Sequence, residues 1–451
     1  MNHRPEQLSI FIFFLMLFVL SLAACTSDKL DNPLDSELEE AMVRVSENGT
    51  LEDYILPQST NFESIPQDPK NPITSEKVAL GKMLFFETGV ALAPVHNIGK
   101  ESYSCGSCHV PSAGFLPGRA QGIADGGVGF GSSGEERNKI PSYDDIELDA
   151  QGARPLSMVN VAFSNNTSWN GQFGIGGANE GTEHLWNNNT ITEVNHLGFK
   201  GIESQNIEGV HLHRMVYNEE VLSDLGYTTH FDNAFSDLPV EERYLNETAA
   251  LAISAFVRTI IPNRAPLQEW LDGNCDAMSD SEKRGAILFF GKAGCVNCHQ
   301  GAALNDLKFE ALGVEDLHQN GGLNTDVDDR RNLGRGGFTG AEVDMFKFRV
   351  PQLYNLKDAG HYFHGSSKNS LREVVEYFNK AEPENENVPN EQISVYFRPL
   401  KLSEQEVDDI TSFLSESLYD PDLERYVPSS VLSGNCIPNN DLFSQIDLGC
   451  Q

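Results

Sequence analysis

The sequence predicts a mostly α-helical protein made of two related domains, and three observations support this prediction. Apolar residues recur at three- and four-residue spacing over residues 246–260, 370–380 and 403–417, as one face of a helix requires. Alternation typical of strands is sparse. A short segment also recurs 204 residues further along the chain. That period is too long for a solenoid repeat, so each copy is expected to be a domain.

The recurring segment is predicted to be a helix that ends in Leu-Phe-Phe. Residues 80–86 read LGKMLFF and residues 284–290 read RGAILFF. Thr74 and Ser279 stand a few residues ahead, each followed by a Glu, and hydroxyl residues in this position cap helix N-termini. We therefore expect one helix to begin near each of them.

A Cys-x-x-Cys-His motif follows each copy of this segment, and it is typical of covalent haem attachment. The two thiols add to the haem vinyl groups, and the adjacent His ligates the iron. A zinc site or a thioredoxin-like redox pair would be the alternatives. However, Cys295 lies 187 positions after Cys108, and no βαβ pattern surrounds the motifs. The sequence thus predicts two haem c groups, held by Cys105, Cys108, His109, Cys295, Cys298 and His299.

The N-terminus is typical of an export signal. Arg4 precedes an apolar run over residues 10–20, which is too short to span a bilayer but suits a signal-peptide core. The run ends in Leu-Ala-Ala-Cys, which resembles a bacterial lipobox, so residues 1–24 are predicted to be removed and Cys25 acylated. An ordinary secretory signal is the alternative. We expect a lipid-anchored protein of the cell envelope, at the outer membrane, with its body in the periplasm or at the surface. Residues 25–70 are acidic and predicted to be a tether with little core.

Three cysteines remain after haem attachment and acylation. A disulfide between Cys436 and Cys450 would clip a tail over residues 431–451, and closing such a loop is worth about 3 kcal/mol in the chain-entropy description. Cys275 paired with one of them is the alternative.

The charge balance restricts the partners. With 32 basic and 66 acidic residues, the net charge is −34 at pH 7. This charge excludes nucleic-acid binding as the main activity. It also repels anionic membranes, so the only membrane contact expected is through the lipid anchor. Cationic proteins, in contrast, are attracted.

Several further segments resemble the bacterial di-haem cytochrome c peroxidase family, which includes MauG-type members. They are IPNRAP at 261–266, FRVPQLYN at 348–355 and YFHG at 362–365, and the resemblance runs from about 77 to 418. It implies a mostly α fold of two cytochrome c-like haem domains packed against each other. Residues 71–265 would form the N-terminal, peroxidatic domain, and residues 266–430 the C-terminal, electron-transfer domain.

The resemblance also implies an activity. Hydrogen peroxide would be reduced to water at the N-terminal haem, with electrons from a small cytochrome c or copper protein passed through the C-terminal haem. A MauG-type oxidase that modifies a partner protein and a pure electron-transfer cytochrome are the alternatives. A homodimer is also compatible with the resemblance.

Two residues of this sequence match functional positions of the family. Trp169 matches a tryptophan between the haems, where an indole shortens the electron-transfer gap; a packed interface aromatic is the alternative. Glu208 resembles the distal glutamate that moves a proton between the peroxide oxygens, unless it is a surface residue. The neighbouring His211 and His213 are possible assistants.

The sequence departs from the family at both iron sites. Asp125 stands where members of the family have the distal His that blocks the first haem. We expect this carboxylate to stay hydrated and to leave the iron open. At the second haem, Phe378 stands where the family has an axial Met or Tyr, and a phenylalanine cannot ligate iron. Tyr377 is therefore the tentative ligand, and Met345 is a weaker candidate. The acidic run Asp326, Asp328 and Asp329 suggests Ca²⁺ between the domains, although the Gly and Glu of an EF-hand loop are missing; a solvated loop is the alternative.

Overall fold

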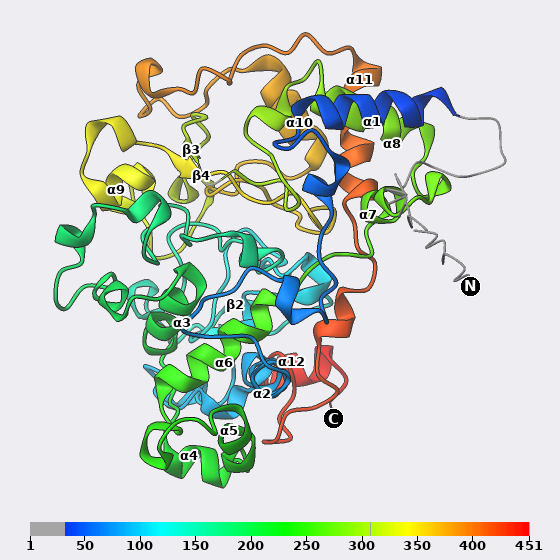
Figure 1. Ribbon diagram of the computed structural model, residues 1–451. Coiled ribbons are helices and arrows are strands. Elements are labelled where there is room, and N and C mark those ends of the chain that lie inside the picture. Colours follow the sequence, from blue (N-terminus) through cyan, green and yellow to red (C-terminus); the bar gives the residue numbers. More distant parts are fainter. Residues whose placement is uncertain (1–31, 307, 451) are drawn as a thin grey trace, which may run out of the picture.

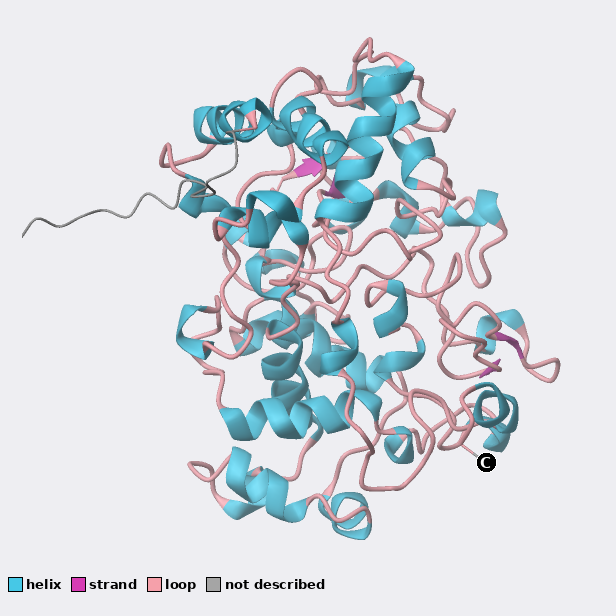
Figure 2. Cartoon of the chain, turned by 90° about the vertical axis from the view of Figure 1, so that its right-hand side faces the viewer, coloured by secondary structure: helices cyan, strands magenta, loops and turns pink. Residues whose placement is uncertain are grey.

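The computed structural model describes residues 32–306 and 308–450, and it consists of two helical bodies joined by long irregular segments (Figures 1 and 2). The predicted signal peptide and Cys25 lie outside the described residues. No helix within the described ranges is long and apolar enough to cross a membrane.

The lower body in Figure 1 is formed by the helices between residues 75 and 258 together with the C-terminal helix. Its centre is α6, which is buried along almost its whole length and packs along α2 and α3. The helices are α2 (Ser75–Phe86), α3 (Gly201–Leu212), α4 (Glu219–Asp224), α5 (Thr228–Ala234), α6 (Asn246–Arg258) and α12 (Leu442–Asp447).

The upper body contains the second copy of the Leu-Phe-Phe helix, α8, which packs along α11. A π-helical turn, Phe413–Ser417, continues α11. The helices are α1 (Pro33–Val45), α7 (Pro266–Leu271), α8 (Asp280–Phe290), α9 (Arg335–Thr339), α10 (Leu371–Lys380) and α11 (Glu404–Ser412). The three helices predicted from apolar spacing therefore form as α6, α10 and α11.

The duplication predicted from the sequence is visible in how the two Leu-Phe-Phe helices pack. The side chains of Thr74 and Ser279 cap α2 and α8, as predicted. Each helix crosses its partner at a glycine: a Cβ on Gly81 would lie 1.9 Å from the Ala252 carbonyl oxygen, and one on Gly285 would lie 1.9 Å from that of Asp409. A side chain at either crossing would push the helices apart.

Strand structure is confined to two short antiparallel pairs within the described residues. β1 (Gly127–Val128) pairs with β2 (Asn138–Lys139), and β3 (Phe309–Glu310) pairs with β4 (Phe348–Arg349). The second pair matters for the site because β4 places Phe348 and Arg349 at the boundary between the bodies.

The prediction that residues 25–70 form a tether with little core is wrong for residues 32–70, the part that the structure describes. Leu38, Ala41 and Met42 of α1 are buried, and α1 packs along α8 of the upper body. Asp35 accepts a hydrogen bond from the Trp270 indole at 2.7 Å and pairs with Lys283. The acidic composition hid an amphipathic helix whose apolar face extends the core.

The tail returns to the lower body and covers the first Cys-x-x-Cys-His motif. Cys436 and Cys450 form a disulfide with a Cα–Cα distance of 5.9 Å, so neither pairs with Cys275. Ser104, next to the motif, donates a hydrogen bond to the Pro438 carbonyl at 2.8 Å, and buried Arg137 pairs with Asp441. The tail thus belongs to the N-terminal body. One cluster of buried apolar side chains runs through both bodies, so they pack as one core.

Candidate functional site: two cavities that share a wall

The two Cys-x-x-Cys-His motifs adopt the same local structure. Each begins with a single 3₁₀ turn, Cys105–Ser107 or Cys295–Asn297. In both, the backbone N–H of the histidine donates to the carbonyl of the first cysteine, at 3.1 Å for His109 and 3.0 Å for His299. This turn brings both thiols and the imidazole of a motif to one side of the chain.

The two imidazoles are oriented in the same way. The Nδ1 atom of His109 lies 3.2 Å from the Phe115 carbonyl oxygen, and that of His299 lies 2.9 Å from the Leu304 carbonyl oxygen. A carbonyl at Nδ1 fixes the ring and leaves Nε2 to ligate a metal. Burial lowers the pKa of both histidines to about 4, so they present the neutral form that binds iron.

The Leu-Phe-Phe helices position these rings. The centroid of the Phe85 ring lies 6.4 Å from that of His109, with 48° between the planes. In the second copy, Phe289 lies 6.3 Å from His299 at 46°. The sequence repeat is therefore a structural repeat that extends to the ligand position.

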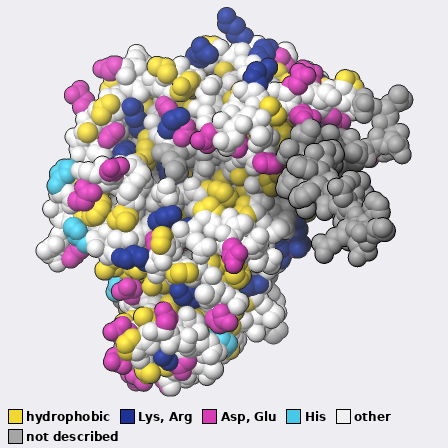
Figure 3. Space-filling view, viewed as in Figure 1, with side chains coloured by type: hydrophobic (Ala, Val, Ile, Leu, Met, Phe, Trp, Pro, Cys, Tyr) yellow, Lys and Arg dark blue, Asp and Glu magenta, His cyan; other side chains and the backbone are white. Residues whose placement is uncertain are grey.

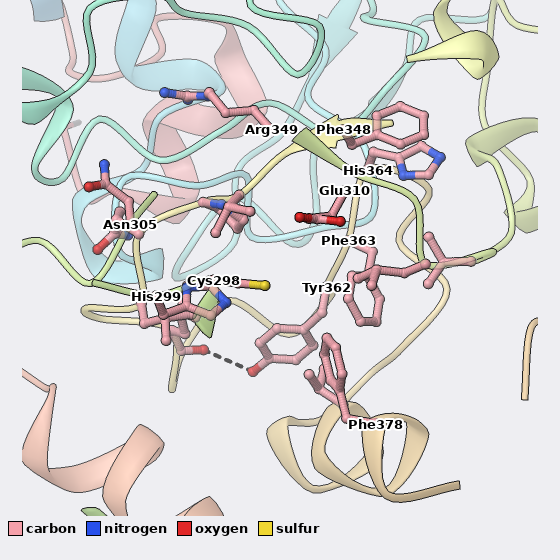
Figure 4. Close-up of a pocket in the computed structure, with 18 of the residues that line it drawn as sticks. Cys298, His299, Asn305, Glu310, Phe348, Arg349, Tyr362, Phe363, His364 and Phe378 are labelled. Carbon is pink, nitrogen blue, oxygen red and sulfur yellow. Dashed lines mark hydrogen bonds between the residues drawn. The ribbon is translucent and has the colours of Figure 1, made fainter. Parts of the chain in front are cut away.

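Each motif opens into its own cavity. The N-terminal cavity has a volume of about 820 Å³ and is lined by Cys105, Cys108 and His109. The C-terminal cavity, drawn in Figure 4, has a volume of about 240 Å³ and is lined by Cys295, Cys298 and His299.

Trp169 lies in the wall that the two cavities share. It lines both, and its indole N–H donates to the Arg154 carbonyl at 2.5 Å. On the C-terminal side its ring lies 6.1 Å from the His364 ring, which stacks on Phe348 at 3.5 Å. The structure thus brings Trp169 between the two motifs, where the sequence reasoning expected it.

Two buried arginines in the shared wall test whether the cavities fit haem. Arg154 and Arg349 line both cavities, and no ion pair links either to a carboxylate of the described residues. Arg154 bonds only to carbonyl oxygens, and Nε of Arg349 has no partner. Burial lowers the pKa of Arg154 to about 9 and that of Arg349 to about 10.

Buried cations without a counter-charge are costly, so anionic groups are expected beside them. Haem propionates are such groups. Together with the paired thiols and oriented imidazoles, the two arginines make the cavities fit two haem c groups. The sequence reasoning missed both arginines, because their burial cannot be read from composition.

Glu208, the predicted proton-transfer residue, does not line the N-terminal cavity. It lies on α3, where burial raises its pKa, but the residues of this helix that reach the cavity include Gln205, Gly209 and Val210. Successive helical residues are about 100° apart, so a one-residue offset turns a side chain out of the cavity.

His213, at the end of α3, does line the cavity. Its Nδ1 atom lies 2.7 Å from the buried Asp149 carboxylate. Burial opposes protonation of this imidazole, but the charge and hydrogen bond of Asp149 outweigh it, and the pKa of His213 is raised. The sequence reasoning had given His213 only a secondary place.

Asp125 is buried rather than hydrated, which corrects the expectation for this residue. Its carboxylate accepts hydrogen bonds from the Tyr143 hydroxyl at 2.6 Å and the Val95 backbone at 2.9 Å, and it pairs with Arg214. It is outside the cavity lining. Two acid–base pairs, Asp125–Arg214 and Asp149–His213, link the 124–149 segment to the residues at the end of α3.

The structure does not bring Tyr377 to the C-terminal cavity. Its hydroxyl donates to the Leu312 carbonyl at 2.7 Å, and neither Tyr377 nor Met345 lines the cavity. Phe378 lines it instead and projects from α10 toward Tyr362 and Phe363 (Figure 4).

The calcium expectation gains no support. Among the described residues, no three His, Cys, Asp or Glu side chains are grouped to hold a metal ion. Asp329 pairs with Arg331, and Asp326 accepts from the backbone of Asp328.

Comparisons with known proteins agree with this geometry. The family described as "Di-haem cytochrome c peroxidase" matches residues 75–276. Methylamine utilization protein MauG of Methylorubrum extorquens is 28% identical over 80% of this chain and 83% of its own. Cytochrome-c peroxidase IdrP1 of Pseudomonas sp. is 26% identical over 78% of this chain and 83% of its own.

The chain is thus similar to the di-haem cytochrome c peroxidase family over residues 75–276, and to relatives with MauG and peroxidase names over about four fifths of its length. Its fold is the mostly α fold of two cytochrome c-like domains. A solved MauG-like protein associated with microbial copper homeostasis superposes with a TM-score of 0.55, at 22% identity, over 83% of this chain and 96% of that one. Members of the family are di-haem c oxidoreductases, and the relatives include both peroxidase and MauG names.

Proposed function

We propose that this protein is a di-haem c-type peroxidase that reduces hydrogen peroxide to water. The observation that carries the proposal is the N-terminal cavity, which has the motif histidine His109 and the acid–base pair His213–Asp149 in its lining. Haem c supplies an iron that binds peroxide and exchanges single electrons.

His213 supplies the proton transfer in this proposal. Asp149 fixes the ring through Nδ1 and leaves Nε2 to take a proton from one peroxide oxygen and return it to the departing one. Two electrons and two protons in total convert each peroxide into two water molecules. Trp169, in the shared wall, would carry electrons from the C-terminal to the N-terminal haem.

The electron donor is proposed to be a small cationic cytochrome c or copper protein of the periplasm, because the chain carries a net charge of −34. The lipid anchor at Cys25, the place in the cell envelope and a homodimer remain proposals from the sequence.

A MauG-type oxidase is the second candidate. It is favoured by the similarity to MauG, which at 28% identity is as high as that to the named peroxidases. The two candidates differ in the donor: a peroxidase turns over with a small reduced donor protein, whereas such an oxidase requires the partner protein that it modifies.

The test is steady-state peroxide reduction with reduced cytochrome c, by the haem-loaded protein and by two variants. We expect His213→Gln to lower turnover by roughly 10²–10⁴-fold, as loss of an acid–base group does. Glu208→Gln, on the same helix, is the matched control and should retain turnover. If Glu208→Gln lowered turnover and His213→Gln did not, Glu208 would be the proton-transfer residue. If the wild-type protein did not turn over peroxide at all, the proposed peroxidase activity would be rejected.

A further inference from the structure

A glycine-rich segment over residues 122–131 contributes to the wall of the N-terminal cavity. Gly122 and Ala124 line this cavity. A Cβ on Gly122 would lie 2.6 Å from the Cys108 sulfur, so the segment runs directly past a thiol of the first haem motif. Five of its ten residues are glycines, which lose more conformational freedom on folding than any other residue. The segment therefore needs contacts from elsewhere to keep one conformation.

Buried Arg137 holds this wall segment. Its Nε atom donates to the Ile123 carbonyl at 2.5 Å, and its Nη2 atom donates to the Ala124 carbonyl at 2.9 Å. Arg137 is 1% exposed, and Asp441 of the tail, at 3.3 Å, is the only carboxylate among the described residues that forms an ion pair with it. A buried charge that loses its partner is strongly destabilising. The two contacts of Arg137 with the wall thus depend on a counter-charge that the tail supplies.

The tail also binds the backbone of the wall segment. Its helix α12 lies beside β1, which is part of the segment (Figure 2). The Gly129 N–H donates to Asp441 at 3.0 Å. The N–H groups of Phe130 and Gly131 both donate to Asp447, at 2.9 and 3.0 Å. Asp441 precedes α12 and Asp447 ends it, so both ends of this helix hold the segment.

The tail disulfide keeps α12 in place. The helix has only six residues, and isolated helices of this length are not stable in water. Its apolar residues Leu442, Phe443 and Ile446 are exposed, so they add little burial. The disulfide between Cys436 and Cys450 closes a loop around the helix and restricts the conformations that the tail can adopt.

We infer that the C-terminal tail is a positioning element of the N-terminal cavity. The disulfide holds Asp441 and Asp447, and these carboxylates hold the wall segment in the conformation that leaves the cavity open. Neither carboxylate lines the cavity, so both are positioning residues that act through Arg137 and through the backbone of the segment. The inference rests on the proposed function for the role of this cavity as the peroxide site, but its test does not require peroxide turnover.

Hydrogen exchange and cyanide binding, measured on the oxidised, haem-loaded full chain, test the inference. The double variant Cys436→Ser/Cys450→Ser opens the tail loop, and Asp447→Ala removes the acceptor of two backbone N–H groups. We expect faster exchange of the amides over residues 122–131 in both variants. Cyanide should bind the first haem roughly tenfold more weakly, as when the open conformation falls to about a tenth of the population.

Asp232→Asn is the matched control. Asp232 pairs with Arg243 in the same body, and neither residue lines the cavity. This variant should change neither the exchange nor the cyanide affinity. Asp447 is exposed, so Asp447→Ala decides the question if the cysteine variant does not fold.

Faster exchange with unchanged cyanide affinity would overturn the inference, because the tail would then hold the segment without affecting the cavity. Unchanged exchange would also overturn it, and so would a wild-type protein whose first haem does not bind cyanide. If both effects were found but the wild type did not reduce peroxide, the proposed function would be rejected and the inference retained.

Discussion

At the residue scale, the haem motifs could be predicted because their chemistry is local in sequence. Two sulfur atoms that attach the haem and one imidazole that ligates its iron lie within five residues, and one backbone carbonyl orients the imidazole of each motif. The partners across the cavity could not be predicted in this way. Whether Glu208 or His213 reaches the cavity depends on the rotation of α3, and the sequence does not define that rotation to one residue.

Trp169 gives a prediction at this scale. Trp169→Phe removes the indole N–H that bonds Arg154 and reduces the aromatic surface between the cavities. We expect slower donor-driven turnover with both haems retained, measured by steady-state kinetics and the haem spectrum. Trp186→Phe is the control, because Trp186 lies outside both linings and its indole N–H donates to the Thr182 hydroxyl. Equal turnover in the two variants would make Trp169 a packing residue.

At the element scale, the sequence repeat predicted the paired helices but not why the glycine inside each is needed. Gly81 and Gly285 allow α2 and α8 to approach their partner helices closely, which becomes visible only when the crossing is built. The amphipathic α1 was missed for a related reason. Its apolar residues Leu38, Ala41, Met42 and Val45 follow helical spacing, but they lie in a segment dominated by acidic side chains.

The crossings predict matched losses of stability. Gly81→Ala and Gly285→Ala each force a Cβ against a backbone carbonyl, so each should lower the free energy of unfolding by about 1–3 kcal/mol. Gly209→Ala in α3 is the control, since its Cβ would meet only ordinary contact at 3.7 Å. Helix propensity should then stabilise Gly209→Ala. Chemical denaturation measures all three, and equal effects would disprove close packing at the crossings.

At the scale of the whole molecule, the acidic balance that excluded nucleic-acid binding also affects donor capture. The face in Figure 3 carries both charge signs, with Asp and Glu gathered over α4 and α5 at its lower end. The fold class could be predicted from periodicity and duplication. The return of the tail to the first motif could not, because it depends on contacts between residues more than 300 positions apart, such as Ser104 with Pro438.

Salt should weaken donor capture if the net charge of −34 steers a cationic partner. The screening length falls from about 30 Å at 0.01 M to about 8 Å at 0.15 M ionic strength. Turnover at limiting cationic cytochrome c should therefore fall over this range, while turnover at saturating donor changes less. An acidic donor that works equally well at all ionic strengths would contradict the steering.

The central claim is that the N-terminal cavity is an open peroxide site. The residue at the position of a blocking histidine, Asp125, is instead held by Tyr143 and Arg214 outside the cavity. The most direct test is to mix the fully oxidised, haem-loaded protein with hydrogen peroxide in a stopped-flow spectrometer, without prior reduction. The account predicts an immediate change in the haem spectrum, at a rate proportional to peroxide concentration. A protein that reacts only after reduction would contradict it, because a ligand would then block the first iron.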